Sequence, residues 1–415
     1  MDIIEACISG DLAAVQKAID SGIDINALSY DGLIPLTRAC AEGHIDVAKL
    51  LIKHGADVEA REDDGYTPLM ATPTVEIAQL LIDNGADVND QSYLDYTPLM
   101  RAQNVDVAKF LIDHGADVNA KRELDWTPLM LAETADIAQL LIDNGADINA
   151  KDAFGANPVL HACMNDTPDV AKLLIEHGAE VNATNDEGDT PLLLACDHQF
   201  SEVAQLLIKH GADINVADSD GHTPLLWACH NNLPDVAQLL IEYGAEVNAT
   251  DDVKNTPLLQ ACDNKLADIA LALIEHGADI NAADTFGNTP LLLMSRSKHT
   301  QIIQLLIDKG AAINVKDDFG FTPLILACNT RHSQIAQLLI DKGADVNAKD
   351  KYGYTPLISA CKTRLSKIAK LLLEHGANPN AKAKDGSTPL NSAKTETLKQ
   401  LLLSHGAKKP RPTTK

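Results

Sequence analysis

Apolar and polar positions follow one short pattern that recurs along the whole chain. In one copy, Thr190 is suited to cap a helix and Pro191 to occupy its first position, where a missing N–H costs nothing. Three polar residues then interrupt the apolar stretch. A second stretch has the spacing of one buried helical stripe, formed by Val203, Ala204, Leu206 and Leu207. Gly211 suits the end of this helix, so the pattern predicts two short helices joined by a turn.

Two markers show that this unit occurs about thirteen times. The proline that opens the first helix recurs at intervals of 33, then three times 30, then again 33 residues, at Pro35, Pro68, Pro98, Pro128, Pro158, Pro191, Pro224, Pro257, Pro290, Pro323, Pro356 and Pro389. The closing glycine recurs at Gly22, Gly55, Gly85, Gly115, Gly145, Gly178, Gly211, Gly244, Gly277, Gly310, Gly343, Gly376 and Gly406. A unit this small cannot bury its own apolar face, so we expect neighbouring units to stack.

The residues between the helix pairs carry a resemblance to a known family. The opening motif Asp218-Ser219-Asp220-Gly221-His222-Thr223-Pro224-Leu225 and the closing motif Gly115-Ala116-Asp117-Val118-Asn119-Ala120 resemble those of the ankyrin repeat. The resemblance covers residues 3 to about 407. It implies an all-α fold, an α-solenoid of stacked helix-turn-helix ankyrin repeats with β-hairpin or turn fingers. The fold alone does not assign a function.

Several copies depart from the family pattern. The family's histidine after Thr-Pro-Leu is replaced in most copies by an apolar residue such as Leu193 or Met70. The turn glycine is replaced by Asp95, Asp125 and Lys254. We expect a capping repeat at residues 1–27, central repeats at 28–381 with the three 30-residue copies within about 61–150, a second capping repeat at 382–407, and a basic tail at 408–415.

Charge is distributed unevenly along the chain. The formal net charge is −25, with +10 from Lys349 to Lys415 and −35 before it. The acidic body argues against binding of nucleic acid or anionic lipid, and favours a partner with basic and apolar surface. The basic end is either a solvated surface or a contact for an acidic partner. No apolar stretch of 18 residues is present, and Met1–Glu5 does not resemble a secretory signal, so we expect no membrane segment.

The chemistry-bearing residues occupy scaffold positions. No nucleotide-binding, nucleophile-elbow, zinc-protease or Cys-x-x-Cys motif occurs, so we predict no enzyme, no cofactor and no metal. The cysteines share one slot on the first helix and are expected to be reduced core thiols, which favours a reducing, cytoplasmic compartment without excluding export into a host cell: Cys7, Cys40, Cys163, Cys196, Cys229, Cys262, Cys328 and Cys361. Seven histidines precede the closing glycine, where they can interact with the last carbonyls of the second helix.

Aromatic residues gather just before the marker proline. Eleven of 15 lie in a four-residue window that covers 48 of 415 positions: Tyr30, Tyr66, Tyr93, Tyr96, Trp126, Phe154, Phe286, Phe319, Phe321, Tyr352 and Tyr354. The resemblance implies that these are hairpin positions on the concave, partner-binding surface of the family. All of them except Tyr30, together with Trp227 on a first helix, are our candidate partner-binding residues. The alternative is that they only pack against neighbouring hairpins.

The three 30-residue copies suggest a sharper hypothesis. Their deletion falls at the end of the first helix and removes nearly one turn. These copies carry Tyr66, Tyr96 and Trp126 two residues before the proline. Either the shortened helices open a recess, lined by an aromatic ladder, that anchors a partner segment, or each ring fills the space of the missing turn.

The sequence thus predicts a monomeric, non-catalytic scaffold that binds another protein. One alternative is a host-directed effector or adaptor of a host-associated microbe, acting by protein binding. Another is binding of an anionic surface or nucleic acid through the basic end, Lys349–Lys415, which includes Lys408, Lys409 and Arg411.

Overall fold

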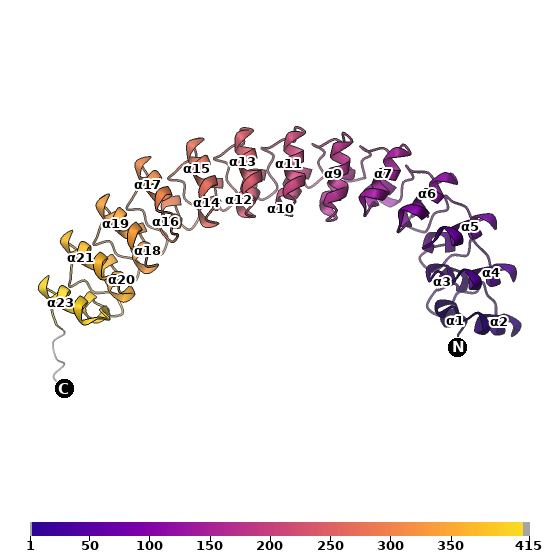
Figure 1. Ribbon diagram of the computed structural model, residues 1–415, viewed down its shortest axis with the longest axis horizontal. Coiled ribbons are helices and arrows are strands. Elements are labelled where there is room, and N and C mark those ends of the chain that lie inside the picture. The colour runs from indigo at the N-terminus through magenta and orange to yellow at the C-terminus, as the bar shows by residue number, and fades with distance from the viewer. Residues whose placement is uncertain (1, 410–415) are drawn as a thin grey trace. The chain divides into compact units, whose positions relative to one another are not determined.

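The computed structural model describes residues 2–409, and all regular structure within them is helical. The chain divides into two units, Met1–Ala212 and Asp213–Lys415. Within each unit, every repeat contributes a first helix and a second helix, and successive helix pairs pack side by side (Figure 1). The stacked all-α arrangement predicted from the repeat is confirmed.

The helices of the first unit fall into two sets. The first helices are α1 (Ile3–Ser9), α3 (Pro35–Ala41), η1 (Pro68–Ala71), η2 (Leu99–Arg101), η4 (Pro128–Leu131), α8 (Pro158–Met164) and α10 (Pro191–Asp197). The second helices are α2 (Leu12–Asp20), α4 (Ile45–Lys53), α5 (Val75–Asp83), α6 (Val105–Asp113), α7 (Ala135–Asp143), α9 (Pro168–Glu176) and α11 (Ser201–Lys209). A further 3₁₀ turn, η3 (Glu123–Asp125), lies in a hairpin.

The second unit repeats the same arrangement. Its first helices are α12 (Pro224–His230), α14 (Pro257–Asp263), α16 (Pro290–Met294), α18 (Pro323–Asn329), α20 (Pro356–Thr363) and α22 (Pro389–Ser392). Its second helices are α13 (Pro234–Glu242), α15 (Ala267–Glu275), α17 (Thr300–Asp308), α19 (Ser333–Asp341), α21 (Ser366–Glu374) and α23 (Glu396–Ser404).

Helix α10 begins and α11 ends as the sequence predicts. The Thr190 hydroxyl accepts a 3.2 Å hydrogen bond from the Leu193 N–H, and Pro191 occupies the first helical position. Beyond α11, Gly211 has a φ of +83°, which turns the chain so that the Ala212 N–H reaches the Leu207 carbonyl at 3.0 Å.

In the 30-residue copies, the first helix is reduced to a 3₁₀ turn of three or four residues, η1, η2 or η4, whereas α10 has seven residues. The last repeat has the same short form, since Pro389 and Gly406 are as close in sequence as Pro68 and Gly85, and α22 has four residues. The sequence analysis missed this fourth short copy because it measured from proline to proline, and no marker proline follows Pro389.

The core consists of apolar side chains that face the neighbouring repeats. Leu225 and Cys229 of α12, and Val236 and Leu240 of α13, are buried. Helices α12 and α14 pack on each other, as do α13 and α15. Each repeat therefore covers the apolar face of the next, and no separate core is needed.

The asparagine of the closing motif connects adjacent repeats through hydrogen bonds. Asn248 donates a hydrogen bond of 3.1 Å to the Gly277 carbonyl and accepts one of 2.7 Å from the Asp279 N–H. Asp279 in turn accepts from the Asn281 N–H at 2.9 Å, so the aspartate of this motif shapes its own loop. These bonds set the spacing between neighbouring hairpins.

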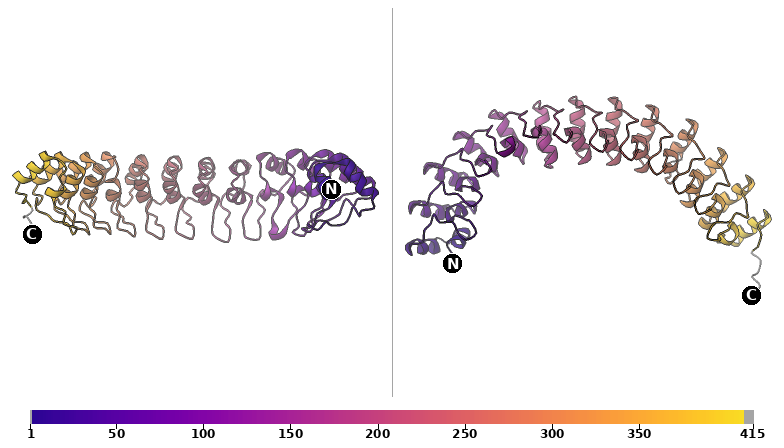
Figure 2. Two further views of the ribbon diagram at one scale, coloured as in Figure 1. Left: turned by 90° about the horizontal axis from the view of Figure 1, so that it is seen from below. Right: turned by 180° about the vertical axis from the view of Figure 1, so that it is seen from behind.

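The fingers between helix pairs are hairpin-shaped turns, and residues 2–409 contain no strand. The Asp218 N–H donates to the His222 carbonyl, and the Gly221 N–H donates to the Asp218 carbonyl, both at 3.0 Å. Asp95, Asp125 and Lys254 replace the turn glycine and keep its left-handed conformation, with φ near +60°. In each unit the fingers project from the same edge of the helical layer (Figure 2).

Candidate functional site

A carboxylate at the base of most fingers in the second unit shapes the hairpin tip. Asp218 Oδ1 accepts hydrogen bonds from the backbone N–H groups of Asp220, at 3.0 Å, and His222, at 2.8 Å. Asp284, Asp317 and Asp350 bind their own hairpins in the same way. The tip residue two positions later is therefore held in one orientation in each of these repeats.

Hydrogen bonds also join successive tips in this unit. The carbonyls of Val253, Phe286, Phe319 and Tyr352 each accept a bond of 2.9–3.1 Å from an N–H of the next finger. The fingers approach so closely that a Cβ on Gly320 would lie 2.9 Å from the Lys351 nitrogen. The tips thus form a rigid row, and their side chains have fixed neighbours.

The side chains on this row are apolar and exposed to solvent. The exposed fractions of Val253, Phe286, Phe319 and Tyr352 lie between 47% and 60%. We call these four residues the distal tip row. Exposed apolar side chains that share one edge are typical of a surface that another molecule covers.

The first unit has a comparable row. Leu94, Leu124 and Phe154 occupy the same tip position in three consecutive fingers, and Tyr93 lies next to Leu94; all four are exposed. The Leu124 carbonyl accepts a 2.9 Å bond from the next finger, as does that of Phe154. We call these four residues the proximal tip row.

The aromatic residues of the 30-residue copies lie behind the proximal tip row. The ring centres of Tyr66 and Tyr96 are 6.2 Å apart. The Arg122 guanidinium lies over both Tyr96 and Trp126, with its carbon 4.6 Å and 4.2 Å from the ring centres. On the other side, the Trp126 ring centre is 4.5 Å from that of His161. Tyr66, Tyr96, Trp126 and His161 thus form a ladder of rings, with the Arg122 guanidinium between Tyr96 and Trp126.

Two further contacts fix the ends of this ladder. At one end, the Arg101 guanidinium carbon lies 5.1 Å from the Tyr66 ring centre. Burial raises the pKa of Tyr66, and the Arg101 charge acts in the opposite direction. At the other end, His161 Nε2 is 2.8 Å from a buried oxygen of Asp152. Burial lowers the pKa of His161, although Asp152 opposes this effect, so the neutral imidazole is favoured.

Recesses adjoin the ladder where the first helices are short. One of about 350 Å³ lies between η2 and η4 and is lined by Met100, Arg101, Leu131 and Glu133 among others. Another of about 190 Å³ is lined by Arg38, Tyr66, Met70 and Arg101 among others. Arg101 therefore borders both recesses. A different recess of about 450 Å³, between α15 and α17, lies on second helices away from the tips.

The comparisons with known families agree with this architecture. Models described as ankyrin repeats match residues 3–92, 72–152, 133–218, 214–284 and 258–350, and a further ankyrin-repeat model matches residues 339–393. The chain belongs to the ankyrin-repeat family. No curated protein matched the chain. Ankyrin repeats are in general protein–protein interaction modules and are typically non-catalytic.

The structure separates the predicted site residues of this ankyrin-repeat chain into groups. Phe286, Phe319 and Tyr352 lie in the distal tip row, and Tyr93 and Phe154 in the proximal one. Tyr66, Tyr96 and Trp126 come together in the ladder. Their roles in binding stay predictions.

Three other predicted residues lie against their own scaffold. Phe321 lies beside Phe319, with ring centres 6.4 Å apart. Tyr354 packs on Ile358 of its own repeat and on Ala381 and Ala383 near the base of the next finger. Its hydroxyl donates to Asp385, and Lys362 Nζ lies 3.9 Å from its ring centre. Trp227 is half-buried on α12.

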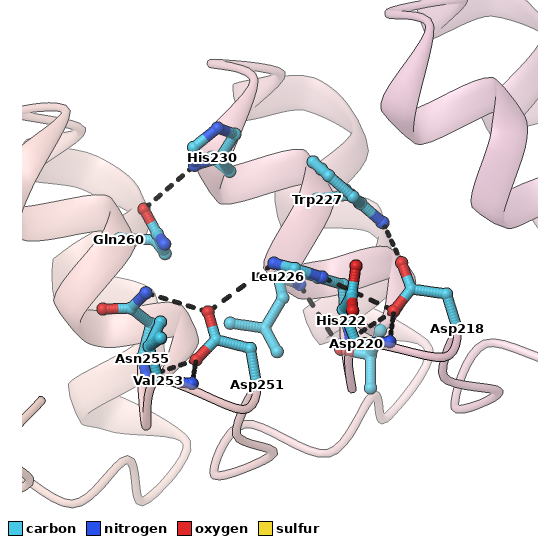
Figure 3. A network of polar contacts seen from close by, with 11 residues as sticks. Asp218, Asp220, His222, Leu226, Trp227, His230, Asp251, Val253, Asn255 and Gln260 are labelled. Atoms are coloured by element: carbon cyan, nitrogen blue, oxygen red, sulfur yellow. Dashed lines mark hydrogen bonds and ion pairs between the residues drawn. The ribbon is translucent and has the colours of Figure 1, made fainter. Parts of the chain in front are cut away.

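Figure 3 shows how Trp227 is held against the finger of its own ankyrin repeat. Its indole N–H donates to Asp218 Oδ2 at 2.9 Å, and His222 stacks on its ring at 4.3 Å between centres. The His222 nitrogens lie 3.4 Å from Asp218 and 3.6 Å from Asp251, a carboxylate of the next finger. Trp227 thus stabilises the finger that contains Asp218 and His222.

The sequence analysis missed part of the surface. It sought aromatic residues and therefore overlooked Leu94, Leu124 and Val253, which occupy the same tip position as Phe154 and Phe286. A search of that one position for any apolar side chain finds them. It also missed Arg101 and Arg122. These side chains contact aromatic rings of other repeats, and such contacts cannot be recognised from the spacing of residues in the sequence.

Histidine and cysteine residues occupy scaffold positions here, as predicted. The Nδ1 atoms of seven histidines lie 2.8–2.9 Å from the carbonyl four residues earlier, in His54, His114, His177, His210, His276, His375 and His405. All eight cysteines are buried free thiols. Burial raises the pKa of Cys163 and Cys229 to about 12, so these thiols are poor nucleophiles.

Within residues 2–409, no group of three or more His, Cys, Asp and Glu side chains is arranged to hold a metal ion. None of the described helices is long and apolar enough to cross a bilayer. Of the basic tail, Lys408 and Lys409 are described, and the Lys408 N–H donates to Asn380 at 2.8 Å. Arg411 lies outside the described residues.

Proposed function

We propose that this ankyrin-repeat chain is a non-catalytic scaffold that binds a partner protein along its fingers and first helices. The observation that carries the proposal is the pair of exposed apolar tip rows, each held by backbone hydrogen bonds. Because the tips are fixed before binding, little conformational entropy is lost when a partner covers them. The family's general role in protein–protein interaction supports the same conclusion.

The partner that best fits the surface as a whole carries basic and apolar groups. Residues before Lys349 have a net charge of −35, which attracts a basic partner over distances that salt limits to about 8 Å. The apolar tips then supply area that becomes buried on contact. We further propose that the chain acts as a monomer in a reducing compartment, where its free thiols persist.

The distal tip row offers a direct test. Phe286→Ser, Phe319→Ser and Tyr352→Ser together remove exposed apolar area and are expected to leave the fold intact. A cross-linking capture from lysate should then recover bound partner at least about tenfold less than the wild-type chain does, since interface aromatics commonly contribute more than about 1 kcal/mol each.

The matched control places serine at exposed apolar positions of the same unit that lie outside the fingers. Tyr243 follows α13 and Leu271 lies on α15, and both are exposed. Tyr243→Ser with Leu271→Ser should leave capture unchanged. Equal capture by the tip variant and this control would refute the proposal for the distal row.

The aromatic ladder needs a separate experiment because its rings are only half-exposed. Replacement of Tyr66, Tyr96 and Trp126 by alanine distinguishes anchoring of a partner from filling of space. Lost capture with an unchanged melting temperature supports anchoring. A large drop in melting temperature supports filling, because truncation of packed aromatic rings leaves cavities.

The basic end supports a second candidate function, contact with an anionic surface or nucleic acid. Its net charge of +10 from Lys349 onward is the observation in favour. Binding of single-stranded DNA that weakens steeply with salt, and that disappears when lysines of this segment are replaced by glutamine, would establish it. Binding insensitive to those replacements would exclude this segment as the site.

A further inference from the structure

The arginines in and around the ladder of the first unit are of two kinds, paired with a carboxylate and unpaired. Four arginines lie in this region, and two of them are paired: Arg38 binds Glu62 through two nitrogens, and Arg61 binds Asp90. Arg101 and Arg122 differ, because among the described residues neither guanidinium donates a hydrogen bond or forms an ion pair. Both instead lie against aromatic rings.

Stacking occupies the face of a guanidinium and leaves its N–H groups free at the edge. These N–H groups lie in one plane and match the two oxygens of a carboxylate. Arg122 is positioned on both sides by Tyr96 and Trp126, so little side-chain entropy is lost when it forms a new bond. Arg38 shows the geometry locally, since its Nε and a terminal nitrogen together engage the Glu62 carboxylate.

Space for a side chain adjoins Arg101. Arg101 borders the recess of about 350 Å³ between η2 and η4, roughly ten times the volume share of one water molecule. Met100 and Leu131 supply apolar walls, and Glu133 lines the same recess without pairing with either arginine. The recess lies where the first helices of these copies are short.

We propose that the ladder is a carboxylate-binding site for an acidic segment of a partner polypeptide. Arg101 and Arg122 receive the side chain of an aspartate or glutamate, and the adjoining recess receives a neighbouring apolar side chain. This inference rests on the proposed scaffold function and specifies the partner's chemistry at one place. The acidity of the rest of the chain does not oppose it, because charges farther than about 8 Å are screened while the stacked guanidiniums make direct contact.

The experiment selects short random peptides with the full chain as bait. Peptides bound by the wild-type chain should share an aspartate or glutamate at one fixed position. The variant Arg101→Gln/Arg122→Gln should lose this enrichment. The control Lys49→Gln/Lys53→Gln should keep it, since it removes the same charge from exposed positions on α4. Melting curves check that each variant is folded. If Arg122→Gln unfolds the chain, the test uses Arg101→Gln alone, because Arg101 is exposed.

Affinity measurements on the best peptide complete the test. Exchange of its acidic residue for the matching amide should weaken binding to the wild-type chain by about 10- to 100-fold, the range for hydrogen bonds to charged groups. The same exchange should have little effect on the arginine variant, as expected for directly paired groups.

Several results would overturn the proposal. They are selection of no peptide, selection without an acidic position, equal affinity for the amide peptide, and displacement of the peptide by single-stranded DNA that binds the ladder more tightly. None of these results bears on the proposed role of the distal tip row. If the serine variants of that row still lose partner capture, the scaffold function stands and only the carboxylate site fails.

Discussion

The indole N–H of Trp227 donates a hydrogen bond of 2.9 Å to Oδ2 of Asp218, the carboxylate whose other oxygen shapes the finger of the same repeat. One carboxylate thereby couples a first helix to a hairpin tip. The same coupling occurs in the first unit, where His161 contacts Asp152 at 2.8 Å. A residue predicted to bind a partner, such as Trp227, can thus serve the scaffold.

The bond between Trp227 and Asp218 predicts a difference between the two tryptophans. Trp227→Phe should destabilise its finger by about 1–2 kcal/mol, because Asp218 Oδ2 loses a donor in a half-buried setting. Trp126→Phe is the matched control, since the Trp126 indole nitrogen is buried without a hydrogen-bond partner. Amide exchange in residues 218–222 should accelerate in the first variant only. Equal exchange in wild type and Trp227→Phe would contradict the assigned role.

Lys254 predicts a gain in stability at one hairpin turn. Its φ of +62° costs a lysine about 1 kcal/mol, and glycine avoids that cost. Lys254→Gly should therefore raise the free energy of unfolding of the second unit in urea by up to about 1 kcal/mol, less the entropy that glycine adds to the unfolded chain. Trp227 fluorescence in a Trp126→Phe background reports the transition. Asp95→Gly lies in the first unit, where Trp126 fluorescence reports the transition, and should gain less because aspartate tolerates this conformation better. Gly221→Ala should lose stability.

The cysteines are predicted to be unreactive in the folded chain. Burial raises the pKa of Cys163, Cys229 and Cys328 to about 12, so at about pH 8 almost no thiolate forms. A thiol reagent should label none of the eight within the time that modifies all of them in concentrated guanidinium. Rapid labelling of any one in the native chain would show that its repeat opens locally.

His161 predicts a loss of stability in mild acid. Its pKa is lowered in the folded state by burial, so the unfolded chain takes up a proton first as the pH falls below about 6.5. The stabilising contribution is complete above that pH and declines as the pH falls, by at most about 1.4 kcal/mol per pH unit. His161→Gln should reduce the slope of melting temperature against pH between about 7 and 5. An unchanged slope would mean that other groups govern acid sensitivity.

The sequence was sufficient to predict the repeat unit because each element depends on neighbours a few residues away. Thr190 caps its own helix, Gly211 ends one, and the apolar stripe of the second helix follows the helical period. The shortened first helices were also predictable, since a deletion is visible when copies are aligned. The fourth short copy was missed because repeat length was measured between marker prolines, and none follows Pro389.

The tertiary structure alone decided which side chains share a surface and which are already engaged. Tyr354 and Phe286 both lie in the four-residue window before a marker proline, yet Tyr354 packs against the next finger while Phe286 is exposed in the distal tip row. Arg38 and Arg101 occupy the same position after the marker proline, yet only Arg38 has a carboxylate partner. Such differences depend on contacts between residues about 30 positions apart, which stacking creates and local sequence does not encode.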